Sequence, residues 1–148
     1  MECSRSSVPE RSFAGYLEGS LSALRRDLPW IYARLCARVA PRELRLKVDD
    51  ELVGLRCGED EIRRIEPPSA PAVEAHIDRQ AILDLVDARI TLLDALLEER
   101  LVVRGALDDV IAFHDGLMIY LHGAVRDPSF PALLRRFRGA HPDQRRAG

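Results

Sequence analysis

The spacing of apolar residues changes twice along the chain, and these changes constrain the fold more than any other feature. Between Phe13 and Pro41, leucine and isoleucine recur every three or four residues, the period of an amphipathic helix. Over 44–57 and again over 73–77, apolar and polar residues alternate, the period of a strand with one wet face. Beyond Asp78 the helical spacing returns. Helices, then a block of strands, then helices predict an α+β fold.

Pro29 interrupts the first helical segment, which predicts two helices, or one kinked helix, ending before Pro41. Asp27 is the expected N-cap of the second helix, with Pro29 in its first turn. The same spacing is also found in coiled coils, but the repeat is short and holds a proline, which favours packing on the domain's own core. The residues of this stripe are Leu17, Leu21, Leu24, Leu28, Ile31 and Leu35.

Alternation predicts two strands, over 44–48 and 53–57, and a third strand over 62–65 alternates poorly. Short turns separate them, at Asp49-Asp50 and within 57–61, so the three form an antiparallel meander. Residues 66–72 hold three prolines, which cannot donate hydrogen bonds to a sheet, and therefore form a loop. Residues 73–77 alternate again and predict a fourth strand.

After this strand, Asp78 is the expected N-cap of a helix over 79–90, and a second short helix begins near Thr91 or Asp94. Residues 101–105 include two β-branched valines and end in glycine, which predicts a last strand. The apolar stretch 106–123 then predicts a long helix. Asp115-Gly116 inside it is also a hairpin-turn signal, so two short strands remain an alternative. The predicted apolar face comprises Leu107, Val110, Ile111, His114, Leu117, Met118 and Leu121.

Length and composition fit one domain of 148 residues with a hydrophobic core of its own. We expect a disordered lead over 1–12, a folded domain over 13–138 and a basic, flexible tail over 139–148. The formal net charge of -2 gives no bias toward nucleic acid, and too few aromatic residues accompany the arginines for nucleic-acid binding.

Three widely spaced cysteines, Cys3, Cys36 and Cys57, predict neither a disulfide framework nor a structural zinc site. No apolar run is long enough to cross a bilayer, and the N-terminus lacks the apolar core of a secretory signal. We therefore expect a cytoplasmic protein.

The run "VEAHIDRQAILDLVDARITLLDALLEERLVVRG" (73–105), followed by the long apolar helix, resembles the type-two sterol carrier protein domain, SCP2. The matching pattern is a strand ending in a small polar residue, two short helices, a basic-apolar-basic-Gly strand (100–105) and a closing helix, and the resemblance spans residues 13–137. The sequence departs at Glu99, where the family often carries glycine just before the last strand.

The resemblance implies a mostly antiparallel, five-stranded twisted sheet covered by helices, with an elongated apolar tunnel between the two layers. It implies a carrier or accessory module for a long-chain apolar ligand (fatty acyl, sterol-like or isoprenoid), with no catalytic residues, metal or cofactor. The alternative is a non-catalytic protein-interaction subunit that uses the same fold with a closed core. The expected tunnel-lining residues are Leu83, Val86, Leu93, Leu96, Val110, Phe113, His114, Leu117, Met118 and Leu121.

Other candidate groups have simpler interpretations. His76 and Asp78 lie two residues apart and on the same strand face as Glu74, a pattern typical of a solvated strand face. His114 lies on the predicted apolar face. It is more typical of a hydrogen-bonded core histidine than of a residue that binds a lipid head group. An enzyme with His114 or Asp115 as base is disfavoured, since no acid–base pair can be assigned. The expected contact with an anionic membrane surface or an acidic protein partner is through Arg135, Arg136 and Arg138.

Overall fold

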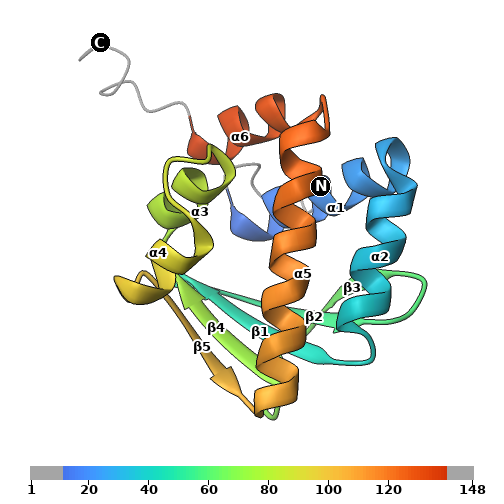
Figure 1. Cartoon of the computed structure of the whole chain (residues 1–148), viewed down its shortest axis with the longest axis vertical. Coiled ribbons are helices and arrows are strands. Elements are labelled where there is room, and N and C mark those ends of the chain that lie inside the picture. Colours follow the sequence, from blue (N-terminus) through green and yellow to red (C-terminus); the bar gives the residue numbers. More distant parts are fainter. Residues whose placement is uncertain (1–11, 140–148) are drawn as a thin grey trace, which may run out of the picture.

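The structure is a computed structural model that describes residues 12–139. In this range, six helices lie over one face of a five-stranded sheet (Figure 1). The predicted disorder of 1–12 and flexibility of 139–148 fall outside the described residues, apart from Ser12 and Gly139, which cap α1 and α6. The elements are α1 Phe13–Asp27, α2 Pro29–Val39, β1 Glu43–Val48, β2 Glu51–Cys57, β3 Ile62–Ile65, β4 Val73–Ile77, α3 Arg79–Val86, α4 Leu92–Leu97, β5 Leu101–Gly105, α5 Leu107–Arg126 and α6 Phe130–Arg138.

The sheet has the strand order β3-β2-β1-β4-β5. β1, β2 and β3 form the predicted antiparallel meander, and β5 is antiparallel to β4. The exception is β4, which returns parallel to β1 with Leu46 opposite Ala75. The α+β class and the mostly antiparallel five-stranded sheet are therefore confirmed. Leu44, Leu46 and Val48 are buried on the helix-covered face, as their alternation predicts.

The N-terminal stripe forms two helices, separated at Leu28, with Pro29 in the first position of the second helix. The prediction that Asp27 caps α2 is wrong, because Asp27 is the last residue of α1 and Leu28 is the N-cap. Pro29 has no N–H, so α2 starts with one fewer donor that needs a cap. The Asp27 carboxylate instead accepts hydrogen bonds from Arg26 and from the hydroxyl of Ser129, which precedes α6.

The two short helices begin where the sequence predicts. Asp78 accepts from the backbone N–H of Ala81 (2.7 Å), and Thr91 and Asp94 form a reciprocal capping box. The first helix ends at Val86 rather than near residue 90, and Ala88 has a left-handed backbone (φ 62°).

Glu99, the residue in the family's glycine position, also adopts a left-handed conformation (φ 59°). That conformation is the one glycine favours, and it costs a side-chain-bearing residue about 1–2 kcal/mol. β5 nevertheless pairs with β4 in full register, from Leu101 opposite Ile77 to Gly105 opposite Val73. The substitution therefore leaves the last strand in place and adds local strain before it.

The apolar stretch after β5 forms one continuous helix, α5, so the hairpin alternative is excluded. The predicted face of α5 is wrong in part, because four of its residues lie on the exposed side: Leu107, Ile111, His114 and Met118. Small residues decide the orientation of this helix. A Cβ added at Gly116 would lie 2.5 Å from Val39 Cγ1, and one at Gly123 would lie 2.7 Å from Leu24 Cδ2. Close packing on α2 and α1 therefore turns the glycine side inward and moves the stripe of larger residues outward.

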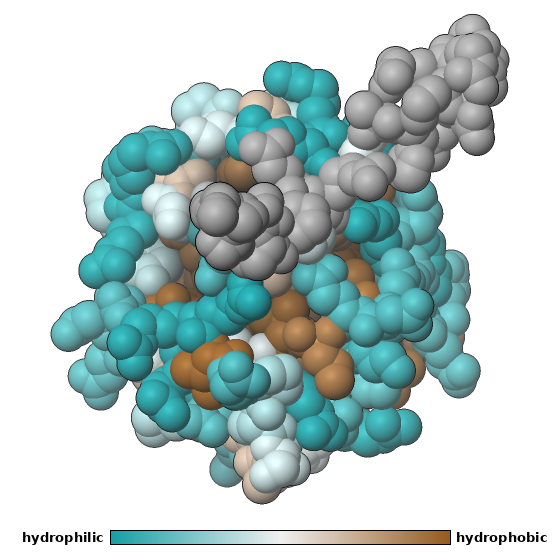
Figure 2. Space-filling view, turned by 180° about the vertical axis from the view of Figure 1, so that it is seen from behind, coloured by the Kyte–Doolittle hydropathy of each residue, from teal (hydrophilic) through white to brown (hydrophobic). Residues whose placement is uncertain are grey.

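α6 closes the end of the helical layer against α1. Its buried residues are Phe130, Leu134 and Phe137, and the Phe137 ring stacks on Tyr16 with 4.7 Å between centroids. Its arginines face outward. Seen from behind, the surface is mainly hydrophilic and is broken by separate hydrophobic patches (Figure 2).

Candidate binding cavity

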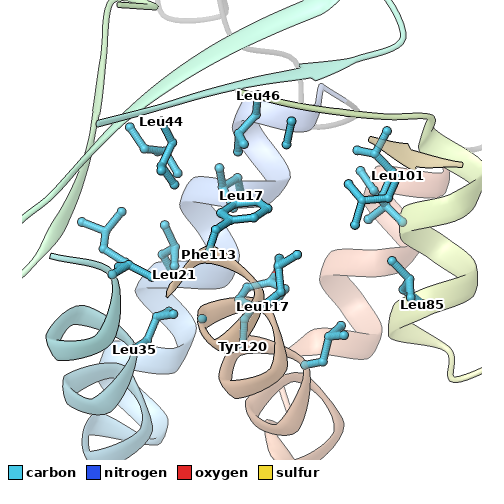
Figure 3. A pocket seen from close by; sticks show the side chains of 18 of the residues that line it. Leu17, Leu21, Leu35, Leu44, Leu46, Leu85, Leu101, Phe113, Leu117 and Tyr120 are labelled. Atoms are coloured by element: carbon cyan, nitrogen blue, oxygen red, sulfur yellow. The ribbon is translucent and has the colours of Figure 1, made fainter. Parts of the chain in front are cut away.

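A cavity of about 140 Å³ lies between the sheet and the helical layer; we call it the central cavity. Side chains from α1, α2, α3, α5 and the sheet converge on it, and Figure 3 shows Leu17, Leu46 and Phe113 among them. No charged side chain lines it, and the atoms that face the space are all apolar. Its chemistry suits an apolar guest.

The volume limits what can enter without movement. A dry protein cavity of about 150 Å³ lined by leucine, isoleucine and phenylalanine accepts a molecule the size of benzene. The central cavity therefore has room for one ring or a short segment of chain. A long-chain ligand requires the helices to move away from the sheet.

The predicted tunnel residues fall into three groups. Val86, Phe113, Leu117 and Leu121 line the central cavity. Leu96, Val110 and His114 line a second hollow, together with Phe113 and Leu117. The remaining three line neither space: Leu83 is buried, whereas Leu93 and Met118 are exposed.

This second hollow is a surface groove of about 230 Å³ between α4 and α5, with β5 as its floor; we call it the α4–α5 groove. Every residue along it is apolar except His114. Four side chains, Leu92, Leu101, Phe113 and Leu117, line both the groove and the central cavity. The two spaces are thus separated by a wall that is one side chain thick.

Sequence reasoning missed the part of the cavity wall contributed by the N-terminal helices and the sheet. Tyr16 and Leu21 line it from α1, Leu35 and Val39 from α2, and Ala75 from β4. Leu21, Leu35 and Ala75 belong to apolar faces that the periodicity does predict, whereas Tyr16 and Val39 lie outside the predicted stripe. Periodicity, however, identifies buried faces and carries no information on which facing side chains leave a gap.

Polar groups at the cavity are neutral and hydrogen-bonded. The Tyr120 hydroxyl lies 2.8 Å from that of Tyr16 and 2.9 Å from Ser20 Oγ. Burial raises the pKa of Tyr120 to about 12. Burial also raises the pKa of Cys57, which lines the cavity, to about 12. The Cys57 thiol therefore stays protonated near neutral pH and is a poor nucleophile.

His114 lies on the outer side of α5, with Nδ1 3.5 Å from Asp115 Oδ1. Arg38 pairs with Asp115 at 2.7 Å, and this hydrogen-bonded pairing lowers the pKa of the Asp115 carboxyl. A carboxylate with a lowered pKa is a weak base, so this pair is poorly suited to proton abstraction.

His76 and Glu74 lie 3.3 Å apart on the uncovered face of the sheet, where Arg45 also binds Glu74. Within residues 12–139, no group of three or more His, Cys, Asp or Glu side chains is placed to hold a metal ion. No helix in this range is long and apolar enough to cross a membrane.

The arginines of α6 lie away from the central cavity. Arg135 and Arg136 are exposed, and Arg138 pairs with Asp87 at 3.0 Å. The fold places them at the end of the helical layer where α6 meets α3 (Figure 1).

No protein-family model and no curated protein sequence matches the chain. Several solved structures share its fold. One is described as a UbiJ-SCP2 ubiquinone synthesis protein (TM-score 0.57, 19% identity, 78% of this chain and 92% of that one). A second is sterol carrier protein domain 2 of Helicoverpa armigera (TM-score 0.57, 16% identity, 80% and 94%). A third is a conserved protein from Thermus thermophilus, described as possibly a sterol carrier protein (TM-score 0.51, 15% identity, 81% and 92%). The order of helices and strands, the sheet topology and these likenesses together show that the chain has the fold of the SCP2 domains.

Proposed function

We propose that this protein is a non-catalytic lipid-binding carrier or accessory module that holds a long-chain apolar ligand between its sheet and its helices. The single observation that carries the proposal is the central cavity, which has no charged lining residue and lies in the middle of the core. Two of the solved structures that share the fold are described as sterol carrier domains, one of them as possibly so, and a third as a ubiquinone synthesis protein. The ligand is accordingly an acyl, sterol-like or isoprenoid compound.

The energetics of an apolar guest favour binding once the cavity opens. Each methylene removed from water contributes about 0.8 kcal/mol. A chain of a dozen or more carbons therefore offsets the loss of translational freedom and the cost of moving side chains. The unfilled space also supports carriage over the alternative of an interaction subunit with a closed core, because close-packed interiors hold few voids larger than a water molecule.

The proposal is tested on the purified full chain. Extraction into organic solvent followed by mass spectrometry is expected to release an apolar lipid in a fixed ratio to protein. A delipidated sample is then expected to take up the environment-sensitive dye Nile red, and the dye is expected to be displaced by long-chain lipids. A protein with no co-purifying lipid and no dye uptake is incompatible with carriage and favours the interaction subunit.

A further inference from the structure

We infer that the α4–α5 groove is the entrance through which the ligand reaches the central cavity, and that the ligand is an uncharged lipid. This inference rests on the proposed function. It adds a route and a chemical class, which the fold alone does not assign.

The first observation is the thin wall between groove and cavity. Leu92 and Leu101 line both spaces from one side, and Phe113 and Leu117 line both from α5. Rotation of these four side chains is enough to join the two spaces. Leucine and phenylalanine side chains hop between rotamers quickly compared with the rearrangement of packed helices.

The second observation is that α4 is short and packs less closely on α5 than α2 does. It has six residues, and residues with left-handed backbones lie near its two ends, Ala88 and Glu99. Its own capping box stabilises this short helix. The opposite side of α5 differs, because Gly116 and Gly123 pack closely on side chains of α2 and α1. Opening is therefore easier on the α4 side than on the α2 side.

The third observation is an exposed apolar margin. Leu93 (61% exposed) and Leu97 (73%) lie on α4, and Leu107 (73%) and Ile111 (44%) lie on α5. Large apolar side chains exposed together mark ligand grooves and contact sites more often than ordinary surface. Here Ile111 lines the groove, and Leu93 and Leu97 lie on the helix that forms its other side, where an apolar molecule in transit needs apolar contacts.

The fourth observation is the sign of charge on these elements. Glu98 is the C-cap of α4, Glu99 follows it, and Asp108 lies in the first turn of α5. All three are exposed, and none forms an ion pair within residues 12–139. Arg100 is turned toward Asp84 (3.0 Å), and Arg104 is on the uncovered side of the sheet, in the same pleat as its partner Glu74.

An anionic head group is therefore disfavoured both at the α4–α5 groove and inside the central cavity. Carboxylates near the groove repel a carboxylate or phosphate on approach. Inside the central cavity no cation is present to pair with one, and an unpaired buried charge is strongly unfavourable. An alcohol, a quinone or a hydrocarbon meets neither barrier.

The test compares two pyrene-labelled probes of equal chain length, a fatty alcohol and a fatty acid, by stopped-flow fluorescence on the delipidated full chain. Wild type is expected to bind the alcohol at least about tenfold more tightly than the acid.

The route is tested with tryptophan variants. Ile111→Trp narrows the groove, and residue 111 does not line the central cavity. The association and dissociation rates of the alcohol are therefore expected to fall together by about tenfold, and the Kd is expected to stay unchanged within about twofold. Leu96→Trp narrows it from the α4 side with the same expected result. Val125→Trp, an exposed site on α5 outside the groove, is the matched control and is expected to leave both rates unchanged.

The charge is tested with the double variant Glu98→Gln and Glu99→Gln. We expect this variant to associate faster with the acid at low salt and at an unchanged rate with the alcohol. The control is Glu59→Gln with Asp60→Asn, which removes two exposed carboxylates elsewhere and is expected to change neither association rate.

Unchanged rates in both tryptophan variants place the entrance elsewhere and overturn the route. Equal affinity of wild type for acid and alcohol overturns the ligand class. If wild type binds neither probe nor Nile red, the proposed function itself fails, and the inference fails with it.

Discussion

The hydroxyl of Tyr120 lies 2.9 Å from that of Ser20, which joins α5 to α1 at the boundary of the central cavity. Tyr16 extends this contact, with its hydroxyl 2.8 Å from Tyr120, and Ser20 Oγ donates to the carbonyl of Leu17. Because a hydroxyl has a single proton, Tyr120 donates to one neighbour and accepts from the other. These buried polar groups therefore satisfy one another beside a cavity whose facing atoms are apolar.

Tyr120→Phe is expected to lower the free energy of unfolding by about 1–3 kcal/mol, because it leaves buried hydroxyls of α1 without their partner. Urea denaturation followed by circular dichroism measures the change. Ser22→Ala, an exposed serine on the same helix as Ser20, is the control and is expected to have little effect. A Tyr120→Phe midpoint equal to wild type contradicts a stabilising role for the cluster.

Stability is expected to fall in alkaline solution. Burial raises the pKa of Cys57 and of Tyr120 to about 12 in the folded chain. In the unfolded chain these groups ionise near about 8.5 and about 10, so the folded state binds more protons over this range. Their contribution is complete below the unfolded pKa values and is lost as pH rises toward about 12.

Urea titrations at several pH values measure this slope. Cys57→Ala is expected to make the decline shallower from about pH 9 upward, whereas Tyr120→Phe changes it only above about pH 10. A wild-type stability that stays constant up to pH 12 is inconsistent with neutral, buried forms of these two groups.

Gly116→Ala is expected to destabilise the protein although alanine is the better helix former. A Cβ at this position lies 2.5 Å from Val39 Cγ1, and a β-branched valine has little rotamer freedom to make room. We expect a net loss of about 1–3 kcal/mol, after a gain of about 1 kcal/mol in helix propensity. Thermal melts compare it with His122→Ala on the exposed face of α5. A melting temperature above that of wild type shows that α2 and α5 can separate at little cost.

Ala75→Leu is expected to reduce ligand affinity by at least about tenfold, because the larger side chain fills space that a ligand needs. Ala75 lies on β4, is 3% exposed and lines the central cavity. Ala33→Leu makes the same change on the exposed side of α2 and is the matched control. Nile red titration gives both affinities. Equal affinities for the two variants mean that the dye binds outside the central cavity.

The arginines of α6 are predicted to contact anionic membrane surfaces, since each basic residue near such a surface contributes about 1 kcal/mol. Arg135→Gln with Arg136→Gln is expected to weaken co-sedimentation with vesicles containing about 30% phosphatidylglycerol, and high salt is expected to have the same effect. Arg63→Gln with Arg64→Gln on β3 removes the same charge elsewhere. If both double variants lose binding equally, the attraction is not specific to α6.

The sequence by itself determined the class of fold and the type of most elements, but it left open whether residues 106–123 form a helix or a hairpin. The strand alternation over 44–57 and 73–77 and the capping residues Asp78 and Thr91 are local features, and the structure has the corresponding elements. Local rules fail where neighbours compete: Asp27 has the side chain of an N-cap, yet it ends α1 and accepts hydrogen bonds from Arg26 and Ser129.

Only the tertiary structure decided which way α5 faces and where the core stays open. Leu107 and Met118 fit an apolar stripe as well as Phe113 does, but close packing at Gly116 turns Phe113 inward and leaves the other two exposed. The spacing of apolar residues in the sequence determines that a helix has an apolar side. The orientation of the helix, and any unfilled volume beneath it, depend on the shapes of side chains that are distant in sequence and meet only in the folded chain.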